Sequence, residues 1–180
     1  MNITVFGSSK PVPGDPDYEQ AYRLGKLIAS GGDVAITGGY MGTMEAVSRG
    51  AAEAGGHVIG VTCLQIEAWR GTRANPWVSE ERKEETLIER LEELVQVCQA
   101  AIALPGGPGT LAEISLLWNL LVIQAFPPKP FILVGPGWQN VFATFKENLG
   151  AYNGQADWDW LHFSADVESA YQIAVNHPGQ

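Results

Sequence analysis

Two clusters of glycine mark positions where the chain could bind an anion. Gly38-Gly39 follow one short apolar run, and Gly106-Gly107 with Gly109 follow another. Glycine lets backbone N–H groups approach a phosphate closely, and a helix that begins at such a loop directs its positive end at the same group. The sequence therefore predicts a ligand that carries a phosphate.

Glu113 is the carboxylate nearest to the second glycine cluster. Thr110 and Glu113 are three residues apart at the start of an apolar helical segment, which is the spacing of a capping box. A carboxylate beside an anion site can also face the reacting sugar of a phosphorylated ligand. We place catalysis ahead of capping for Glu113, and the two roles are compatible.

Arg90 is the second candidate for chemistry. It borders the apolar stripe of a helix predicted over Ser79–Val97, where Leu91 and Leu94 belong to the stripe. From the residues alone, an exposed ion pair with Glu93, three positions further on, is the simpler explanation.

Two common nucleotide motifs are excluded. No Gly-x-x-x-x-Gly-Lys-Ser/Thr string occurs, so the lysine and hydroxyl of a P-loop triphosphatase are missing. Residues Gly107–Ala112 match Gly-x-Gly-x-x-Ala, but no Asp or Glu occurs between Glu113 and Glu147. The carboxylate that binds a dinucleotide ribose, expected about 20 residues after the glycines, is therefore absent.

No metal or cofactor site is predicted. The three histidines, His57, His162 and His177, are far apart, and none has Cys or a carboxylate at ligand spacing. None of the lysines has a convincing pyridoxal phosphate context. These lysines are Lys10, Lys26, Lys83, Lys129 and Lys146.

The composition is that of a globular, acidic chain. Its 180 residues are 46% hydrophobic and 17% charged, and the net charge is −9. This charge repels polyphosphate backbones, so nucleic acid is not an expected partner. Cys63 and Cys98 stand in apolar surroundings, as free thiols of a reducing compartment do. Without a basic leader or an apolar stretch of about 20 residues, we expect a cytoplasmic protein with no membrane span.

Short apolar runs alternate with segments of helical period, which predicts a mostly parallel sheet covered by helices on both faces. We expect one α/β domain over residues 1–180, a three-layer sandwich whose doubly wound sheet has about six strands. The predicted strands are Ile3–Phe6, Val34–Thr37, His57–Val61, Ala101–Leu104, Phe131–Val134 and Trp160–Phe163. The predicted helices are Asp17–Ser30, Thr43–Ala54, Ser79–Val97, Thr110–Gln124, Trp138–Asn148 and Ala165–Val175. Both glycine clusters then lie at the carboxyl edge of the sheet, where such sheets bind ligands.

Three segments resemble one known family. Residues Pro105–Glu113 resemble the PGGxGTxxE signature of the LOG (Lonely Guy) family, in a Rossmann-like superfamily once labelled lysine decarboxylases. Thr37–Val47 is similar to that family's GGG-x-x-G-x-M-x-x-V loop, and Phe6–Ser9 to its opening F-x-G-S-S. The resemblance covers about residues 1–135. It places the family's arginine, fifteen residues before the proline of the signature, at Arg90.

The resemblance implies a phosphoribohydrolase that cleaves the N-glycosidic bond of a nucleoside 5′-monophosphate, with Arg90 and Glu113 as the catalytic pair and with no cofactor. The decarboxylase label is not supported. The residues expected to bind the phosphate and nucleotide are Gly7, Ser8, Ser9, Gly38, Gly39, Gly42, Thr43, Gly106, Gly107, Gly109 and Thr110.

The alternative is a carrier that binds a nucleotide or the molybdenum cofactor without turnover, as some relatives in the superfamily do. Pro108 stands where many LOG members have an aromatic residue, Leu91 stands where they have lysine, and Gln65–Trp77 lacks the common form.

The predicted helix Thr110–Gln124 is apolar on nearly all sides. Its pattern fits either a buried central helix or a subunit contact, and the resemblance implies a homodimer.

Overall fold

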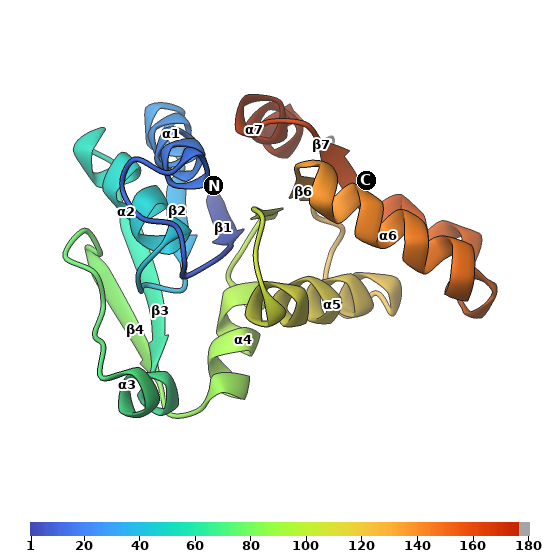
Figure 1. The fold of residues 1–180 in the computed structure, drawn as a ribbon, viewed down its shortest axis with the longest axis horizontal. Helices are drawn as coiled ribbons and strands as arrows, with labels where there is room; N and C mark the ends of the chain where they lie inside the picture. Colours follow the sequence, from blue (N-terminus) through green and yellow to red (C-terminus); the bar gives the residue numbers. More distant parts are fainter. Residues whose placement is uncertain (177–180) are drawn as a thin grey trace.

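The computed structural model describes residues 1–176 and contains one sheet of seven parallel strands (Figure 1). The order across the sheet is β4-β3-β2-β1-β5-β6-β7, so the chain starts at the centre, winds to one edge and returns beside β1. The strands are β1 Asn2–Phe6, β2 Val34–Thr37, β3 Val58–Cys63, β4 Glu80–Glu84, β5 Ala100–Ala103, β6 Phe131–Val134 and β7 His162–Ser164. The register pairs Ile3 of β1 with Ala35 of β2 and Ala100 of β5. The doubly wound α/β fold is confirmed, with seven strands rather than about six.

Helices cover both faces of this sheet. They are α1 Pro16–Ser30, α2 Thr43–Glu53, α3 Leu64–Arg70, α4 Leu87–Gln96, α5 Pro108–Val122, α6 Pro136–Leu149 and α7 Val167–Asn176, with 3-10 turns η1 Gly150–Tyr152 and η2 Gln155–Trp160. One core lies between the sheet and α1, α2 and α7, and a second between the sheet and α4, α5 and α6. Alternation along β1 explains the division, because Ile3 and Val5 enter the first core and Phe6 enters the second.

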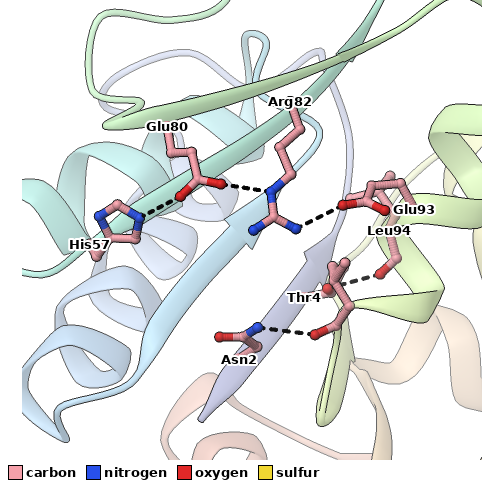
Figure 2. A network of polar contacts seen from close by, with 8 residues as sticks. Asn2, Thr4, His57, Glu80, Arg82, Glu93 and Leu94 are labelled. Atoms are coloured by element: carbon pink, nitrogen blue, oxygen red, sulfur yellow. Dashed lines mark hydrogen bonds and ion pairs between the residues drawn. The ribbon is translucent and has the colours of Figure 1, made fainter.

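Strand β4 corrects the predicted helix Ser79–Val97, which in the structure begins only at Leu87. Five consecutive charged residues, EERKE, give no apolar period from which a strand could be predicted. The strand instead depends on its pairing with β3 and on side-chain charges (Figure 2). Arg82 Nε lies 2.7 Å from Glu80 Oε1 and its Nη1 lies 2.8 Å from Glu93 Oε1 on α4. A charged edge strand also disfavours pairing with another sheet.

Figure 2 also shows how α4 is joined to the centre of the sheet. The Thr4 hydroxyl on β1 donates a hydrogen bond of 3.0 Å to the Leu94 carbonyl, and the Asn2 amide donates one of 3.1 Å to the Val97 carbonyl. Glu93 is occupied by Arg82, so the exposed pair of Arg90 with Glu93, which was the simpler alternative, does not form. Arg90 is free to face inward.

Two other expectations need correction. Helix α5 begins at Pro108 with Gly107 as N-cap and no side-chain cap, so Thr110 and Glu113 do not form a capping box. A capping box is present instead at Thr86, which accepts from the Glu89 amide at 3.2 Å and precedes α4. Helix α3 and the two 3-10 turns were not expected, because segments of three to seven residues carry little periodic signal.

Cys63 and Cys98 are both buried and free, as their apolar surroundings predict. Within residues 1–176, none of the helices combines the length and the apolar character that crossing a membrane requires.

Candidate active site

A cavity of about 590 Å³ lies at the carboxyl edge of the sheet. Its walls come from the loop after β1, the start of α2, the helices α3 and α4, and the first turns of α5. This is the edge at which the glycine clusters predicted a ligand site. Both Arg90 and Glu113 line this cavity.

Arg90 and Glu113 face each other inside the cavity. Arg90 Nη1 lies 3.6 Å from Glu113 Oε1, and the two side chains are only 6% and 9% exposed. They come from different helices, α4 and α5, and are 23 positions apart in sequence. The structure therefore brings together the two residues that the sequence singled out for catalysis.

The guanidinium of Arg90 is held in place by the backbone of two strands. Its Nε donates to the Val61 carbonyl on β3 at 2.8 Å, and its Nη2 donates to the Gly38 carbonyl after β2 at 3.3 Å. The Tyr40 ring lies 5.7 Å from its central carbon. These contacts leave Nη1 to face Glu113 and the cavity.

Glu113 lies in the second turn of α5, where burial removes its carboxylate from water. Burial raises the pKa of Glu113 from 4.5 to about 7, although the charge of Arg90 acts in the opposite direction. A carboxyl group with a pKa near neutrality can bind or release a proton at physiological pH. Perturbed carboxylates of this kind concentrate at functional sites.

The N-terminus of α5 offers backbone donors to the same cavity. The first turn has no acidic residue and no side-chain cap, and Pro108 at its first position has no N–H to offer. Gly107 and Gly109 line the cavity, and a Cβ at either position would have no neighbouring atom within 4 Å. The backbone at these glycines is thus open to a ligand, and the helix dipole favours an anion there.

The loop after β1 forms another part of the cavity wall. Gly7, Ser8, Ser9 and Lys10 line the cavity. The Ser8 carbonyl accepts hydrogen bonds from the backbone N–H and the hydroxyl of Thr43, at 2.8 and 3.1 Å. The loop is therefore anchored to the start of α2.

The predicted binding residues divide into two groups. Gly7, Ser8, Ser9, Gly107, Gly109 and Thr110 line the cavity together with the catalytic candidates. Gly38, Gly39, Gly42, Thr43 and Gly106 do not contribute to its wall. Gly42 shows what this second group does, because with φ of 77° it packs directly against the backbone of Ser8 and Ser9.

Sequence reasoning missed several residues of the cavity. Lys10 lines it, and so do Gln65, Ile66, Trp69 and Arg70 of α3. The signal was present in the spacing, because positions i, i+1, i+4 and i+5 share one face of a helix. It was overlooked because the segment 65–77 was not recognised as containing a helix.

Asn75 was noted only as part of a segment that departs from the LOG pattern, and the structure gives it a supporting role. Its side-chain amide donates to the carbonyls of Gly39 and Tyr40, at 3.1 and 2.9 Å. It thereby fixes the loop that holds Arg90.

The two histidines that the structure describes, His57 and His162, do not form a site. His57 Nε2 lies 3.1 Å from Glu80 at the β3–β4 edge, whereas His162 is on β7 at the opposite edge. His177 lies outside the described residues. Across residues 1–176, no group of three or more His, Cys, Asp or Glu side chains could hold a metal ion.

Comparisons with a family model and with curated proteins point to the same family. The SLOG cluster4 family model matches residues 1–123. A protein of Oryza sativa subsp. japonica named "Probable cytokinin riboside 5′-monophosphate phosphoribohydrolase LOGL9" is 37% identical over 112 residues, which are 61% of this chain and 48% of that protein. The chain spans about half the length of the first curated relatives it matches.

Solved structures extend the likeness over nearly all of the chain. The molybdenum cofactor binding protein from Rippkaea orientalis has a TM-score of 0.72 and 27% identity, and the match covers 96% of this chain and 93% of that one. The molybdenum cofactor carrier protein from Chlamydomonas reinhardtii has a TM-score of 0.70 and 26% identity, with 97% of each chain covered. The chain therefore belongs to the SLOG cluster4 family, and its curated relatives confirm the resemblance to the LOG family.

Proposed function

We propose that this protein hydrolyses the N-glycosidic bond of a nucleoside 5′-monophosphate to release a free base and ribose 5-phosphate. The observation that carries the proposal is the buried Arg90–Glu113 pair beside the uncapped N-terminus of α5. The names of the rice relatives describe the same class of reaction. In this proposal Arg90 and Glu113 are the catalytic pair, and residues 1–180 act as one domain.

The charges around the cavity support an anionic substrate. Lys10, Arg70 and Arg90 line it, against the single carboxylate of Glu113. This concentration of positive charge contrasts with the net charge of −9 of the chain. Positive charge in a cleft attracts an anion and focuses its field there. We assign the phosphate to the amides of Gly107, Gly109 and Thr110, with Lys10 supplying charge from the facing loop.

The catalytic pair matches the charges that develop in the reaction. Breaking the glycosidic bond leaves positive charge on the ribose ring and negative charge on the departing base. The Glu113 carboxylate would stabilise the ribose cation and orient the attacking water, and the Arg90 guanidinium would position the substrate and offset the charge of the leaving base. None of these steps requires a metal or a redox cofactor.

The residues that lie behind the cavity wall have a supporting part in this proposal. Gly38 gives Arg90 its backbone acceptor, and Gly42 and Thr43 hold the loop that contains Ser8. Gly39 accepts from Asn75, and Gly106 leaves room for the Thr110 side chain. Their role is to shape the site rather than to touch the phosphate.

Incubation with adenosine 5′-monophosphate, followed by chromatography for adenine, tests the function. Wild-type protein should release adenine and ribose 5-phosphate in equal amounts, and Glu113→Gln should abolish release. Arg90→Lys, which keeps the charge but not the planar fork, should also lose most activity. Tight binding of the nucleotide by wild type without any release would contradict the hydrolase.

A carrier of a nucleotide or of the molybdenum cofactor is the second candidate. The observation that favours it is the share of this chain that each relative matches. The two molybdenum cofactor proteins align with at least 96% of this chain, whereas the rice relative matches 61%. A carrier would bind its ligand equally well in wild type and Glu113→Gln. The release assay and a binding titration on the same two proteins separate the candidates.

We also propose a homodimer, formed in part through α5. Part of the apolar surface of this helix is covered within the chain. Trp118 packs against Phe142 and Trp158 and donates to the Asp157 carbonyl at 2.7 Å. Leu111 and Ile123 nevertheless remain 42% and 64% exposed. Sedimentation of the wild type should show a dimer, and Ile123→Asp should shift the equilibrium toward the monomer. A monomeric wild type would refute the proposed homodimer.

Two further expectations remain proposals. The acidic charge argues against nucleic acid as a partner, and the free thiols of Cys63 and Cys98 fit a cytoplasmic location. A filter-binding assay with single- and double-stranded DNA checks the first, and fractionation of cells that express the chain checks the second.

A further inference from the structure

Helix α3 forms one wall of the cavity without belonging to the core of the protein. None of its residues is buried. Its Glu67 is paired with Lys83 of β4, with Nζ 3.0 Å from Oε1, and the Gln65 side-chain oxygen accepts from the Leu87 N–H at 2.8 Å. The helix is thus attached to β4 and to the start of α4, beside which it lies in Figure 1.

Trp69 is the most conspicuous residue of this helix. It lines the cavity and yet its side chain is 76% exposed, which is an unfavourable position for so large an apolar surface unless something covers it. The Arg70 guanidinium lies 4.9 Å from the ring centroid. Arg70 contacts the ring locally but does not remove it from solvent.

Most of the residues that α2, α3 and α4 contribute to the cavity wall are apolar. Met44, Ile66, Leu87 and Leu91 come from α2, α3 and α4, and Leu87 is itself 41% exposed. A flat apolar ligand group would cover this surface.

Two polar groups on this side of the cavity are already occupied. The Tyr40 hydroxyl accepts from the Cys63 N–H at 2.8 Å and donates to its carbonyl at 3.1 Å. The Gln65 oxygen is bound to the Leu87 N–H. The Gln65 amide nitrogen and the Arg70 guanidinium are left to meet the hydrogen-bonding edge of a base, so stacking and apolar contact are the main means of holding it.

We infer that Trp69 is a base-stacking residue, which makes the α3 side of the cavity the subsite for the purine ring while the α5 side takes the phosphate. This inference rests on the proposed function and adds to it the residue that recognises the base. The indole would be covered by the ligand in the complex. Trp69 is a binding residue here, and the bond-breaking chemistry stays with Arg90 and Glu113.

The test measures binding apart from turnover. Calorimetric titrations of the full chain carrying Glu113→Gln compare adenosine 5′-monophosphate with ribose 5-phosphate, which has the same phosphate and sugar but no base. Adding Trp69→Ala should weaken binding of the nucleotide about 5- to 150-fold, the range that corresponds to aromatic stacking on single bases, and leave ribose 5-phosphate unchanged. Trp69→Phe should retain most of the affinity.

The matched control is Tyr152→Ala, because Tyr152 is an aromatic residue that is 85% exposed and does not line the cavity. It should bind both ligands as the parent does. Trp69→Ala should also fold normally, since α3 contributes no buried residue, and circular dichroism and sedimentation check this.

Two results would overturn the assignment of Trp69 alone. One is unchanged nucleotide affinity in Trp69→Ala while the wild type still releases adenine. The other is an equal loss for both ligands together with a changed oligomeric state, which would make the indole a subunit contact. If the parent chain binds neither ligand, the proposed function fails and the assignment fails with it.

Discussion

The guanidinium of Arg90 occupies the space next to Gly38 that a side chain at position 38 would need. A Cβ built on Gly38 would collide with Arg90 Nη2 and with the Met44 sulfur. The same Nη2 donates to the Gly38 carbonyl at 3.3 Å. The absence of a side chain at Gly38 thus permits the position of Arg90, a candidate catalytic residue 52 positions away.

Gly38→Ala is therefore expected to displace Arg90. Overpacking at such a site costs about 1–3 kcal/mol of unfolding free energy, and adenine release should fall at least about tenfold. Urea unfolding and the release assay measure the two effects. Gly137→Ala on α6 is the control, because a Cβ there meets no atom within 4 Å, and it should leave both values close to wild type.

Gly107→Ala should separate folding from binding. The added methyl group has no protein neighbour within 4 Å, and φ of −100° suits alanine, so thermal stability should be nearly unchanged. The methyl group would lie on the cavity wall at the start of α5, where we place the phosphate. Affinity for ribose 5-phosphate should therefore fall about tenfold or more in a calorimetric titration. Equal affinity in wild type and variant would show that the phosphate does not bind beside Gly107.

The pH profile of the proposed hydrolysis should report the ionisation of Glu113. If the carboxylate is the form that stabilises the ribose cation, kcat/KM should rise with pH and level off above the raised pKa of about 7. The second pKa of the substrate phosphate is about 6, so an increase in kcat/KM above pH 6 reports the ionisation of a group on the enzyme. A carbon-13 NMR titration of labelled glutamate, with Glu113→Gln to assign the signal, checks the pKa directly. A profile that falls through the same pH would make Glu113 a proton donor instead.

The same ionisation should appear in the stability of the protein. Burial raises the folded-state pKa of Glu113 to about 7 against 4.5 for the ordinary group, so between these values the folded chain holds a proton that the unfolded chain has released. The contribution of this group to the free energy of unfolding is therefore fully present below about pH 4.5. It is lost as the pH rises through 7, by about 3 kcal/mol in total.

Urea unfolding of wild type and Glu113→Gln at pH 5 and pH 8 measures this loss. The free energy of unfolding of wild type minus that of the variant should be smaller at pH 8. Matching pH dependence in the two proteins would show that the carboxyl group titrates normally.

The sequence by itself predicted the architecture and, through the family resemblance, the two candidate catalytic residues. Alternating apolar runs and helical segments specify a doubly wound parallel sheet, because each strand and helix has a local period that reports its buried face. The glycine-rich turn after β5 is likewise local, since backbone access at a helix start depends on a few adjacent residues. The resemblance of Pro105–Glu113 to a known signature pointed to Arg90.

Only the tertiary structure decided where charged residues without an apolar period belong. The segment EERKE forms strand β4 because β3 is available for pairing and because Arg82 reaches Glu93 on helix α4. That arrangement leaves Arg90 turned inward, where the carbonyls of Val61 and Gly38 hold it opposite Glu113. Contacts of this kind join residues far apart in the chain, and local pattern carries no information about which distant groups will meet.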